Sequence, residues 1–242
     1  MSFHIQRPGD RIITIGDMGA VRVFQPRGGA AASNWWEAGG ATGCVAAYQP
    51  VGAASLAASY TDLSGNGNDC GPGTAPTWDA VNGWTFNGTT QYLTTGVSNA
   101  LNQTWTMVIQ FSGATAGTKT LAGNQYTAGA NDNSFVIYPW RTTNNVIYRS
   151  GLSATQIQQA PQLATGNLAI AGRQGYRNGS ADGGLIAVNV GGGSNGAVFI
   201  AAMNYNGSAI QFCNCAISAF ALYDNDIGAT SMAAVAAAMA AL

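Results

Sequence analysis

The chain has 242 residues, of which only 8% are charged, against roughly 25% in a typical soluble domain. Its formal net charge of −1 gives no overall field that would attract nucleic acid, so we expect no nucleic-acid partner. No apolar run reaches the ~18 residues of a membrane helix, and the first residues lack the apolar core of a signal peptide, so we expect no membrane association and no secretion.

Residues 1–33 differ in composition from the rest of the chain. Two short β-type runs at 12–15 and 21–24 flank a Gly-rich turn, and a Gly/Ala segment at 26–33 reads as a flexible linker. This stretch holds four of the nine basic residues, namely Arg7, Arg11, Arg22 and Arg27. We predict a docking arm at 1–33 that contacts a partner, and one globular domain at 34–242. The alternative for the arm is a solvated terminal strand.

Short apolar runs separated by Gly- and Asn-rich turns follow from residue 35 onward. Many short strands with such turns favour an antiparallel sandwich or barrel over βαβ units. In the clearest run, Trp105, Met107, Ile109 and Phe111 alternate on one side, with Val108 opposite. The predicted strands are 45–49, 83–88, 91–96, 104–112, 119–124, 134–140, 145–151, 167–174, 184–190, 197–204 and 209–224.

The C-terminal segment is the one with a helical pattern. Met232, Val235, Met239 and Leu242 recur at spacings of three, four and three, which is one face of a helix. Thr230 or Ser231 can cap its start. Because the apolar stripe is narrow, we expect this helix to pack on the edge of the sandwich.

Four cysteines are present, Cys44, Cys70, Cys213 and Cys215. Without a signal peptide we expect free thiols rather than disulfides. Cys213 and Cys215 lie two residues apart in an apolar run, so in an extended chain both point to one side. Buried thiols are favoured over a metal site, because the remaining cysteines lack ligand-like spacing.

The stretch Asp-Leu-Ser-Gly-Asn-Gly-Asn-Asp at 62–69 has three interpretations. Its glycines and asparagines suit a compact turn, and Asp62 and Ser64 can bond back to loop amides. Alternatively, Asp62 and Asp69 could supply carboxylate oxygens to calcium, or the loop could bind a ligand directly. We favour the structural loop and expect no cofactor, with calcium at Asp62 and Asp69 as the alternative.

Four pieces of the sequence together resemble laminin-G-like (concanavalin A-like) domains. They are the strand at 45–50, the loop at 62–69, the Gly-Trp-Thr-Phe-Asn-Gly-Thr-Thr-Gln-Tyr-Leu unit at 83–93 and the strand at 104–111. A turn at 175–180 and a closing strand at 215–227 fit the same order. The resemblance covers about 43–242 and implies an all-β, antiparallel jelly-roll sandwich with the arm before it and a short C-terminal helix after it.

The segment around Asn34-Trp35-Trp36 also resembles laminin-G-like proteins encoded among bacteriophage structural genes. This resemblance implies a virion structural protein, assembled in the host cytoplasm, that decorates a capsid or forms part of a head or tail fibre. Its arm would dock on a capsid or other virion protein, with Trp35 and Trp36 anchoring arm to domain. By analogy, the protein would form a homo-oligomer, such as a trimer.

Catalysis is not expected from the residues present. A glycosidase needs two carboxylic groups across the scissile bond, yet Glu37 is the single Glu, and the pairs Asp62/Asp69 and Asp224/Asp226 lie in turns or after a strand. The single histidine, His4, is on the arm, which leaves no imidazole for a Ser or Cys nucleophile. We therefore predict that the protein is not an enzyme.

A lectin-like adhesin that binds host or environmental glycans is the alternative function. Sugar sites offer an aromatic face for stacking, with polar groups around it. Of the six tryptophans, Trp140 is the best candidate for exposure, and Arg141 follows it directly. A virion protein that displays its sandwich outward could also bind surface glycans.

Overall fold

The structure, a computed structural model, describes residues 34–98, 101–128, 131–141, 144–152, 155–188 and 193–242. The predicted arm at 1–33, with Arg7, Arg11, Arg22 and Arg27, lies outside the described residues. The residues from Trp35 to Leu242 form one compact unit.

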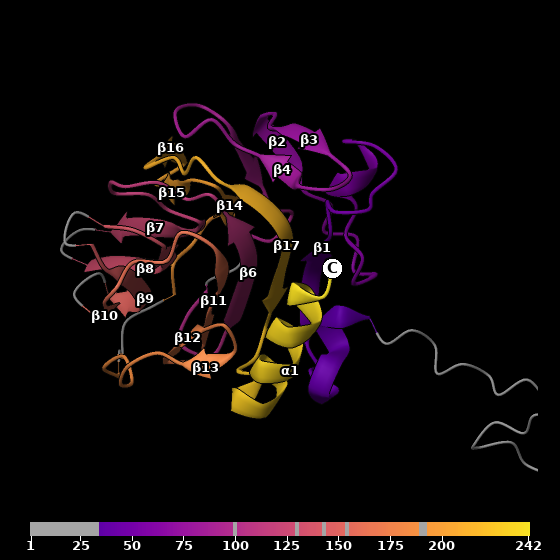
Figure 1. Cartoon of the computed structure of the whole chain (residues 1–242). Helices are drawn as coiled ribbons and strands as arrows, with labels where there is room; N and C mark the ends of the chain where they lie inside the picture. The colour runs from indigo at the N-terminus through magenta and orange to yellow at the C-terminus, as the bar shows by residue number, and fades with distance from the viewer. Residues whose placement is uncertain (1–33, 99–100, 129–130, 142–143, 153–154, 189–192) are drawn as a thin grey trace, which may run out of the picture. The chain divides into compact units, whose positions relative to one another are not determined.

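Two sheets face each other and form a jelly-roll sandwich (Figure 1), which confirms the predicted fold class. Sheet A has the order β13-β12-β11-β6-β17-β4-β3, with β1 also paired to β17. Its strands are β1 (Cys44–Tyr48), β3 (Thr77–Asp79), β4 (Gly83–Thr85), β6 (Thr106–Ser112), β11 (Gly166–Ala171), β12 (Gln174–Arg177), β13 (Ser180–Ala181) and β17 (Ala216–Tyr223).

Sheet B has the order β10-β9-β8-β7-β14-β5-β2, and β15 adds to β7 in parallel while pairing with β16. The other described strand pairs of both sheets are antiparallel. The strands are β2 (Gly71–Thr74), β5 (Tyr92–Thr94), β7 (Ala122–Ala128), β8 (Asn131–Tyr138), β9 (Val146–Leu152), β10 (Gln156–Gln159), β14 (Phe199–Ile200), β15 (Met203–Tyr205) and β16 (Ser208–Ile210).

The main core fills the space between the sheets. Met107, Ile109 and Phe111 of β6 point into it and are almost completely buried, as the alternation in the sequence predicts. Cys213 and Cys215 both join this core, so the two thiols lie on one side as expected. The core is thus built from the inward residues of both sheets.

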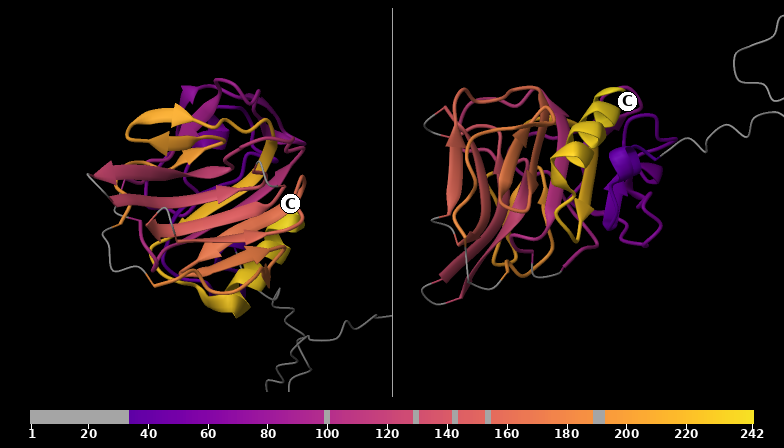
Figure 2. Two further views of the ribbon diagram at one scale, coloured as in Figure 1. Left: turned by 90° about the vertical axis from the view of Figure 1, so that its left-hand side faces the viewer. Right: turned by 90° about the horizontal axis from the view of Figure 1, so that it is seen from below.

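A second apolar layer covers the outer face of sheet A. The helix α1 (Gly228–Ala240) and the short helix η1 (Trp35–Gly40) pack there, on the side away from sheet B (Figure 2, right). Four alanines of β11 and β17 pave the sheet below them and let the helix approach closely; these are Ala169, Ala171, Ala219 and Ala221. Val108 is the apolar residue that interrupts the alternation of β6. It lies on the outer face of sheet A and is buried in this layer.

The helix α1 differs from its prediction in place and in start. Met232, Val235 and Met239 are buried, but against the face of sheet A rather than an edge. The helix begins at Gly228, before Thr230, so neither predicted residue caps it; Asp226 Oδ1 instead accepts the Gly228 N–H at 2.9 Å. Within the described residues, no helix has the length and hydropathy to cross a lipid bilayer.

Trp35 and Trp36 lie inside this second layer. Each is 6% exposed, and their rings meet edge to face with centroids 5.4 Å apart. Tyr223 of β17 donates its hydroxyl to the Trp36 carbonyl at 2.8 Å. Their indoles are therefore packed within the domain. The docking role of the arm that precedes them stays a prediction.

Other strand predictions need correction as well. Residues 184–190 form no strand in the described part: Ile186 is buried, but Leu185 and Val188 are 63% and 66% exposed. The predicted strands at 83–88 and 91–96 contain the shorter strands β4 and β5. These two strands belong to different sheets, so the chain crosses from one sheet to the other between them. A further short helix among the described residues is η2 (Ala58–Tyr60).

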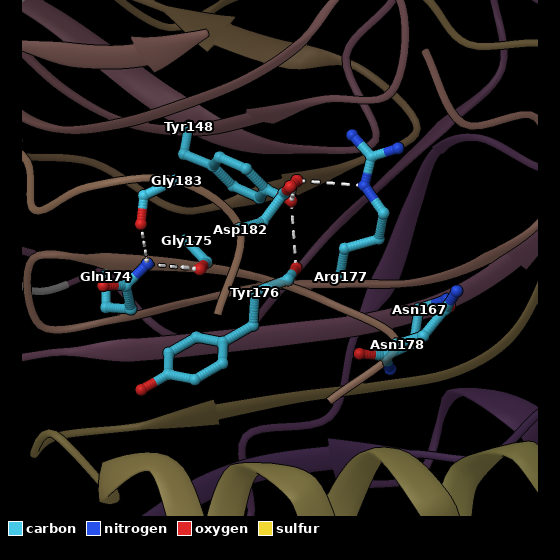
Figure 3. A network of polar contacts seen from close by, with 9 residues as sticks. All are labelled: Tyr148, Asn167, Gln174, Gly175, Tyr176, Arg177, Asn178, Asp182 and Gly183. Atoms are coloured by element: carbon cyan, nitrogen blue, oxygen red, sulfur yellow. Dashed lines mark hydrogen bonds and ion pairs between the residues drawn. The ribbon is translucent and has the colours of Figure 1, made fainter. Parts of the chain in front are cut away.

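A polar clasp joins the two sheets at the β12–β13 hairpin (Figure 3). Asn178 and Gly179 both have positive φ, at 50° and 78°, which suits the two-residue turn predicted at 175–180. Beyond the turn, Asp182 Oδ2 accepts from Arg177 Nε at 3.0 Å and from the Tyr148 hydroxyl at 2.8 Å. Because Tyr148 comes from β9 in sheet B and is fully buried, this clasp is structural.

Candidate functional site

The loop at 62–69 is organised around the carboxylate of Asp62, which is 6% exposed. Its Oδ1 accepts the N–H groups of Ala47 and Ser64, each at 2.9 Å. Its Oδ2 accepts the Ser64 hydroxyl at 2.9 Å and the Asn68 N–H at 3.0 Å. Four donors therefore converge on one buried carboxylate, and one of them comes from β1. Gly65 and Gly67 have positive φ, at 86° and 73°, as expected for a tight turn.

The donor pattern fits poorly with calcium at Asp62 and Asp69. Asp69 Oδ1 accepts the Asp62 N–H at 2.7 Å, so it also serves the loop. A cation at Asp62 would meet N–H and O–H donors in place of oxygen lone pairs. Among the described residues, no group of three or more His, Cys, Asp and Glu could hold a metal ion. The geometry favours the loop-shaping interpretation.

A shallow hollow of about 440 Å³ lies beside this loop, lined by η1, the start of β1 and Ser64. Backbone and small side chains form most of its wall, with Glu37 and Cys44 as its chemically distinctive groups. Burial raises the pKa of the Cys44 thiol to about 12, and the charge of Asp62 adds to the rise. The thiol therefore stays protonated near neutral pH and is a weak nucleophile.

The outward side of sheet B, which we call the open face, carries polar side chains around a small buried apolar cluster of Val136, Tyr138, Ile147 and Met203. Figure 2 (left) shows β7, β8, β9 and β10 turned to the viewer with no helix across them. Since Phe135, Ile137 and Tyr148 point into the core, the residues between them point outward. Strand register sets three outward rows: Tyr205, Gln125, Ser134 and Gly151; Gly123, Val136, Arg149 and Gln156; and Tyr138, Ile147 and Gln158.

Tyr205 gives the open face an exposed aromatic ring. It ends β15 beside β7, is 36% exposed, and its hydroxyl lies 3.5 Å from Thr127 Oγ1. Next to it, Gln125 Nε2 donates to Asp132 Oδ2 at 3.3 Å. An aromatic ring bordered by an amide and a carboxylate can stack on a sugar ring and hydrogen bond to its hydroxyls.

The predicted pair Trp140 and Arg141 follows β8 at the other end of this sheet. Trp140 is half-buried, and its indole Nε1 donates to Asn144 Oδ1 at 3.1 Å. Arg141 lies over the ring of Tyr138, with its Cζ 5.1 Å from the ring centroid. The structure therefore brings Arg141 to the open face. The ligand-binding role of the pair stays a prediction.

Arg149 lies over the same ring, with its Cζ 5.4 Å from the centroid. Its Nε donates to Gln156 Oε1 of β10 at 2.9 Å, which fixes the side chain. Burial lowers the pKa of Arg149, and the charge of Arg141 acts in the same direction. Burial raises the pKa of the Tyr138 phenol, and both guanidinium charges oppose that rise.

Sequence reasoning missed Tyr138, Arg149, Gln156 and Tyr205. The sequence did carry a signal for Tyr138 and Arg149, because these residues occupy adjacent predicted strands that a short connection joins. For Tyr205 there was no such signal, because β15 joins β7 in parallel from a distant part of the chain.

No protein-family model matches the chain, and no curated protein matches it. Solved structures do share the fold. Trypanosoma rangeli sialidase in complex with 2,3-difluorosialic acid matches with a TM-score of 0.58 at 14% identity, over 93% of this chain and 35% of that chain. The chain therefore spans about a third of the sialidase's length.

Two smaller proteins are similar as well. Domain 4 of AbnA, an extracellular GH43 arabinanase from Geobacillus stearothermophilus, in complex with arabinotriose, matches with a TM-score of 0.57 at 15% identity, over 81% of this chain and 99% of that domain. The binding domain of botulinum neurotoxin serotype G matches with a TM-score of 0.53 at 12% identity, over 79% of this chain and 50% of that one. These likenesses support a jelly-roll-like β-sandwich.

The prediction that this protein is not an enzyme is contradicted by these comparisons, because chains of this fold include sialidases. The prediction relied on missing carboxylate and histidine patterns, and such absences exclude only the mechanisms that use those residues. At 14–16% identity the likeness concerns the fold, and no activity follows from it. None of the three structures named above is a bacteriophage protein or a laminin-G domain.

Proposed function

We propose that the chain binds carbohydrate on the open face of sheet B. The observation that carries this proposal is the exposed ring of Tyr205 beside Gln125 and Asp132, on a sheet face that no helix of the described residues covers. Aromatic stacking combined with a few directed hydrogen bonds is how proteins hold sugars, whose faces are apolar and whose edges carry hydroxyls. The lectin-like function predicted as an alternative is thus our first choice.

The fold adds independent support. Domain 4 of AbnA, which matches over nearly its whole length, is in complex with arabinotriose. At 15% identity this likeness cannot identify the sugar or the residues that contact it. It supports a jelly-roll fold as a scaffold for sugar binding. The side chains of the open face would supply the contacts.

Tyr205→Ala should weaken glycan binding about three- to tenfold, because an aromatic contact contributes about 0.5–1.5 kcal/mol. Tyr126→Ala is the matched control, since Tyr126 has a similar exposure of 38% but belongs to the opposite, inward side of β7. Trp140→Ala tests whether Trp140, the aromatic residue predicted from the sequence, contacts the sugar. A glycan array followed by titration of any sugar retained would measure the effect. Equal losses for Tyr205→Ala and Tyr126→Ala, or no glycan bound at all, would exclude the open face as proposed.

The virion role remains a separate prediction. It depends on the arm at 1–33, whose docking residues lie outside the described residues, and the comparisons lend it no support. Binding to a virion partner and oligomerisation, such as a trimer, likewise stay predictions. The low charged fraction, 8%, is the one observation that favours a protein packed against neighbours.

Deletion of residues 1–33 should leave a folded sandwich that retains glycan binding but no longer joins an assembly. The reason is that residues 35–242 form a compact unit that contains both described sheets and the core between them. Circular dichroism, glycan titration and size-exclusion chromatography with light scattering would measure fold, binding and assembly. An assembly state identical to that of the full chain would show that the arm does no docking.

A further inference from the structure

The distribution of cationic side chains on the domain is uneven. Residues 34–242 hold eight acidic and five basic residues, so this part carries a formal charge of −3. Among the described residues, the one ion pair joins Arg177 to Asp182 in the clasp. Arg173 donates its Nε to the Ile186 carbonyl at 2.7 Å, away from the open face. Arg141 and Arg149 are the two arginines that gather over one ring.

The two guanidinium groups share Tyr138 as their support. Tyr138 is 1% exposed, and the Cζ atoms of the partly buried Arg141 and Arg149 lie 5.1 Å and 5.4 Å from its ring centroid. Cation–π contact holds each group, and the Gln156 amide oxygen further fixes Arg149. Neither arginine pairs with a carboxylate within 4.0 Å in the part of the chain that the structure describes. Two neighbouring positive charges therefore have no ion-pair partner among the described residues, and the Asp132 charge acts on Arg149 only from a longer distance.

A carboxylate is the ligand group that this arrangement suits best. The planar guanidinium offers paired N–H donors whose spacing matches the two oxygens of a carboxylate, and the charge makes such bonds stronger than those to a neutral hydroxyl. On a polysaccharide, the carboxylate would belong to a uronic acid. Tyr205 of β15 and Arg149 of β9 are separated by β7 and β8, so a ligand that contacts both is a glycan chain rather than one terminal sugar.

We propose that the open face prefers acidic polysaccharide, with a uronic acid carboxylate held by Arg141 and Arg149 beside Tyr138 and neighbouring sugar units reaching toward Tyr205. This inference rests on the proposed carbohydrate binding and adds the class of sugar. Arg149 acts as the fixed donor, because its side chain is held by Gln156. Arg141 precedes a turn and is held by its backbone, whose N–H donates to the Asn145 carbonyl at 3.1 Å.

The test compares an oligogalacturonate with the same oligosaccharide as its methyl ester, by titration calorimetry on the full chain. The acid should bind about tenfold more tightly than the ester, and its affinity should fall as salt rises. Arg149→Gln and Arg141→Gln should each remove most of this preference. Arg173→Gln, with the same change of charge away from the face, should keep it. Arg149→Lys should recover only part of it, because an ammonium keeps the charge without the fork.

The outcomes distinguish the preference for acidic sugars from carbohydrate binding in general. Equal affinity for acid and ester would overturn the acidic preference while leaving carbohydrate binding intact. Failure to bind the acid, the ester and every neutral glycan would overturn both. Tighter binding of a sulfated neutral glycan than of the uronate would overturn the carboxylate assignment. Thermal melts of each arginine variant, expected to match wild type, would exclude misfolding as the cause.

Discussion

Trp36→Ala is expected to lower the free energy of unfolding by about 3–5 kcal/mol, the usual cost of truncating a large buried aromatic side chain. Trp36 is 6% exposed and contacts Trp35 edge to face, with ring centroids 5.4 Å apart. Its removal would leave a cavity in the layer between η1, α1 and sheet A. Urea denaturation followed by circular dichroism would measure the change.

This result would separate two roles for the tryptophan pair. If Trp36 served only to hold the arm, the isolated chain would lose little stability and would instead lose its partner. Val81→Ala is a suitable control, because Val81 is 81% exposed and such surface changes usually stay within about 0.5 kcal/mol. A loss below about 1 kcal/mol for Trp36→Ala would contradict the packing described above.

The sequence allowed the main core to be predicted but not the layer outside it. Alternation at Met107, Ile109 and Phe111 identifies an inward face directly, because a strand repeats every two residues. The outer face of sheet A is paved by alanines such as Ala169 and Ala219, whose small apolar side chains resemble those of a half-exposed strand. The position of α1 therefore had no strong signal, and the helix was assigned to an edge.

The open face shows the same limit for function. Arg141 was a candidate because it follows Trp140, but its partner Arg149 becomes a neighbour only when β8 and β9 pair. Tyr205 arrives through the parallel addition of β15 to β7, a pairing that periodicity cannot reveal. Functional side chains from separate strands meet through register, and register was not predictable from local pattern alone.

The loop at 62–69 marks an intermediate case. Its composition correctly predicted a turn with positive φ at Gly65 and Gly67. The same composition could not separate loop shaping from calcium binding, since both use carboxylates among glycines and asparagines. The difference lies in which atoms surround Asp62, and these include the Ala47 N–H from β1.

Asp62→Ala should lower the free energy of unfolding by about 3 kcal/mol, measured by urea denaturation. The change removes a buried acceptor of four hydrogen bonds and leaves the Ala47 N–H, on a fully buried residue, without its partner. An unsatisfied buried donor costs about 1–3 kcal/mol, and the loop loses its internal support as well. Ser64→Ala, which removes one of the four donors, should cost only about 1 kcal/mol.

Asp62→Asn and added calcium sharpen the interpretation. The asparagine keeps one acceptor oxygen but turns an NH₂ group toward donors that a carboxylate would accept, so much of the loss should persist. If Asp62 shapes the loop, calcium and a chelator should leave the melting temperature of the wild-type chain unchanged. A calcium-dependent rise in that temperature, absent from Asp62→Ala, would instead assign the carboxylate to a metal site, because an ion that binds only the folded chain stabilises it by mass action.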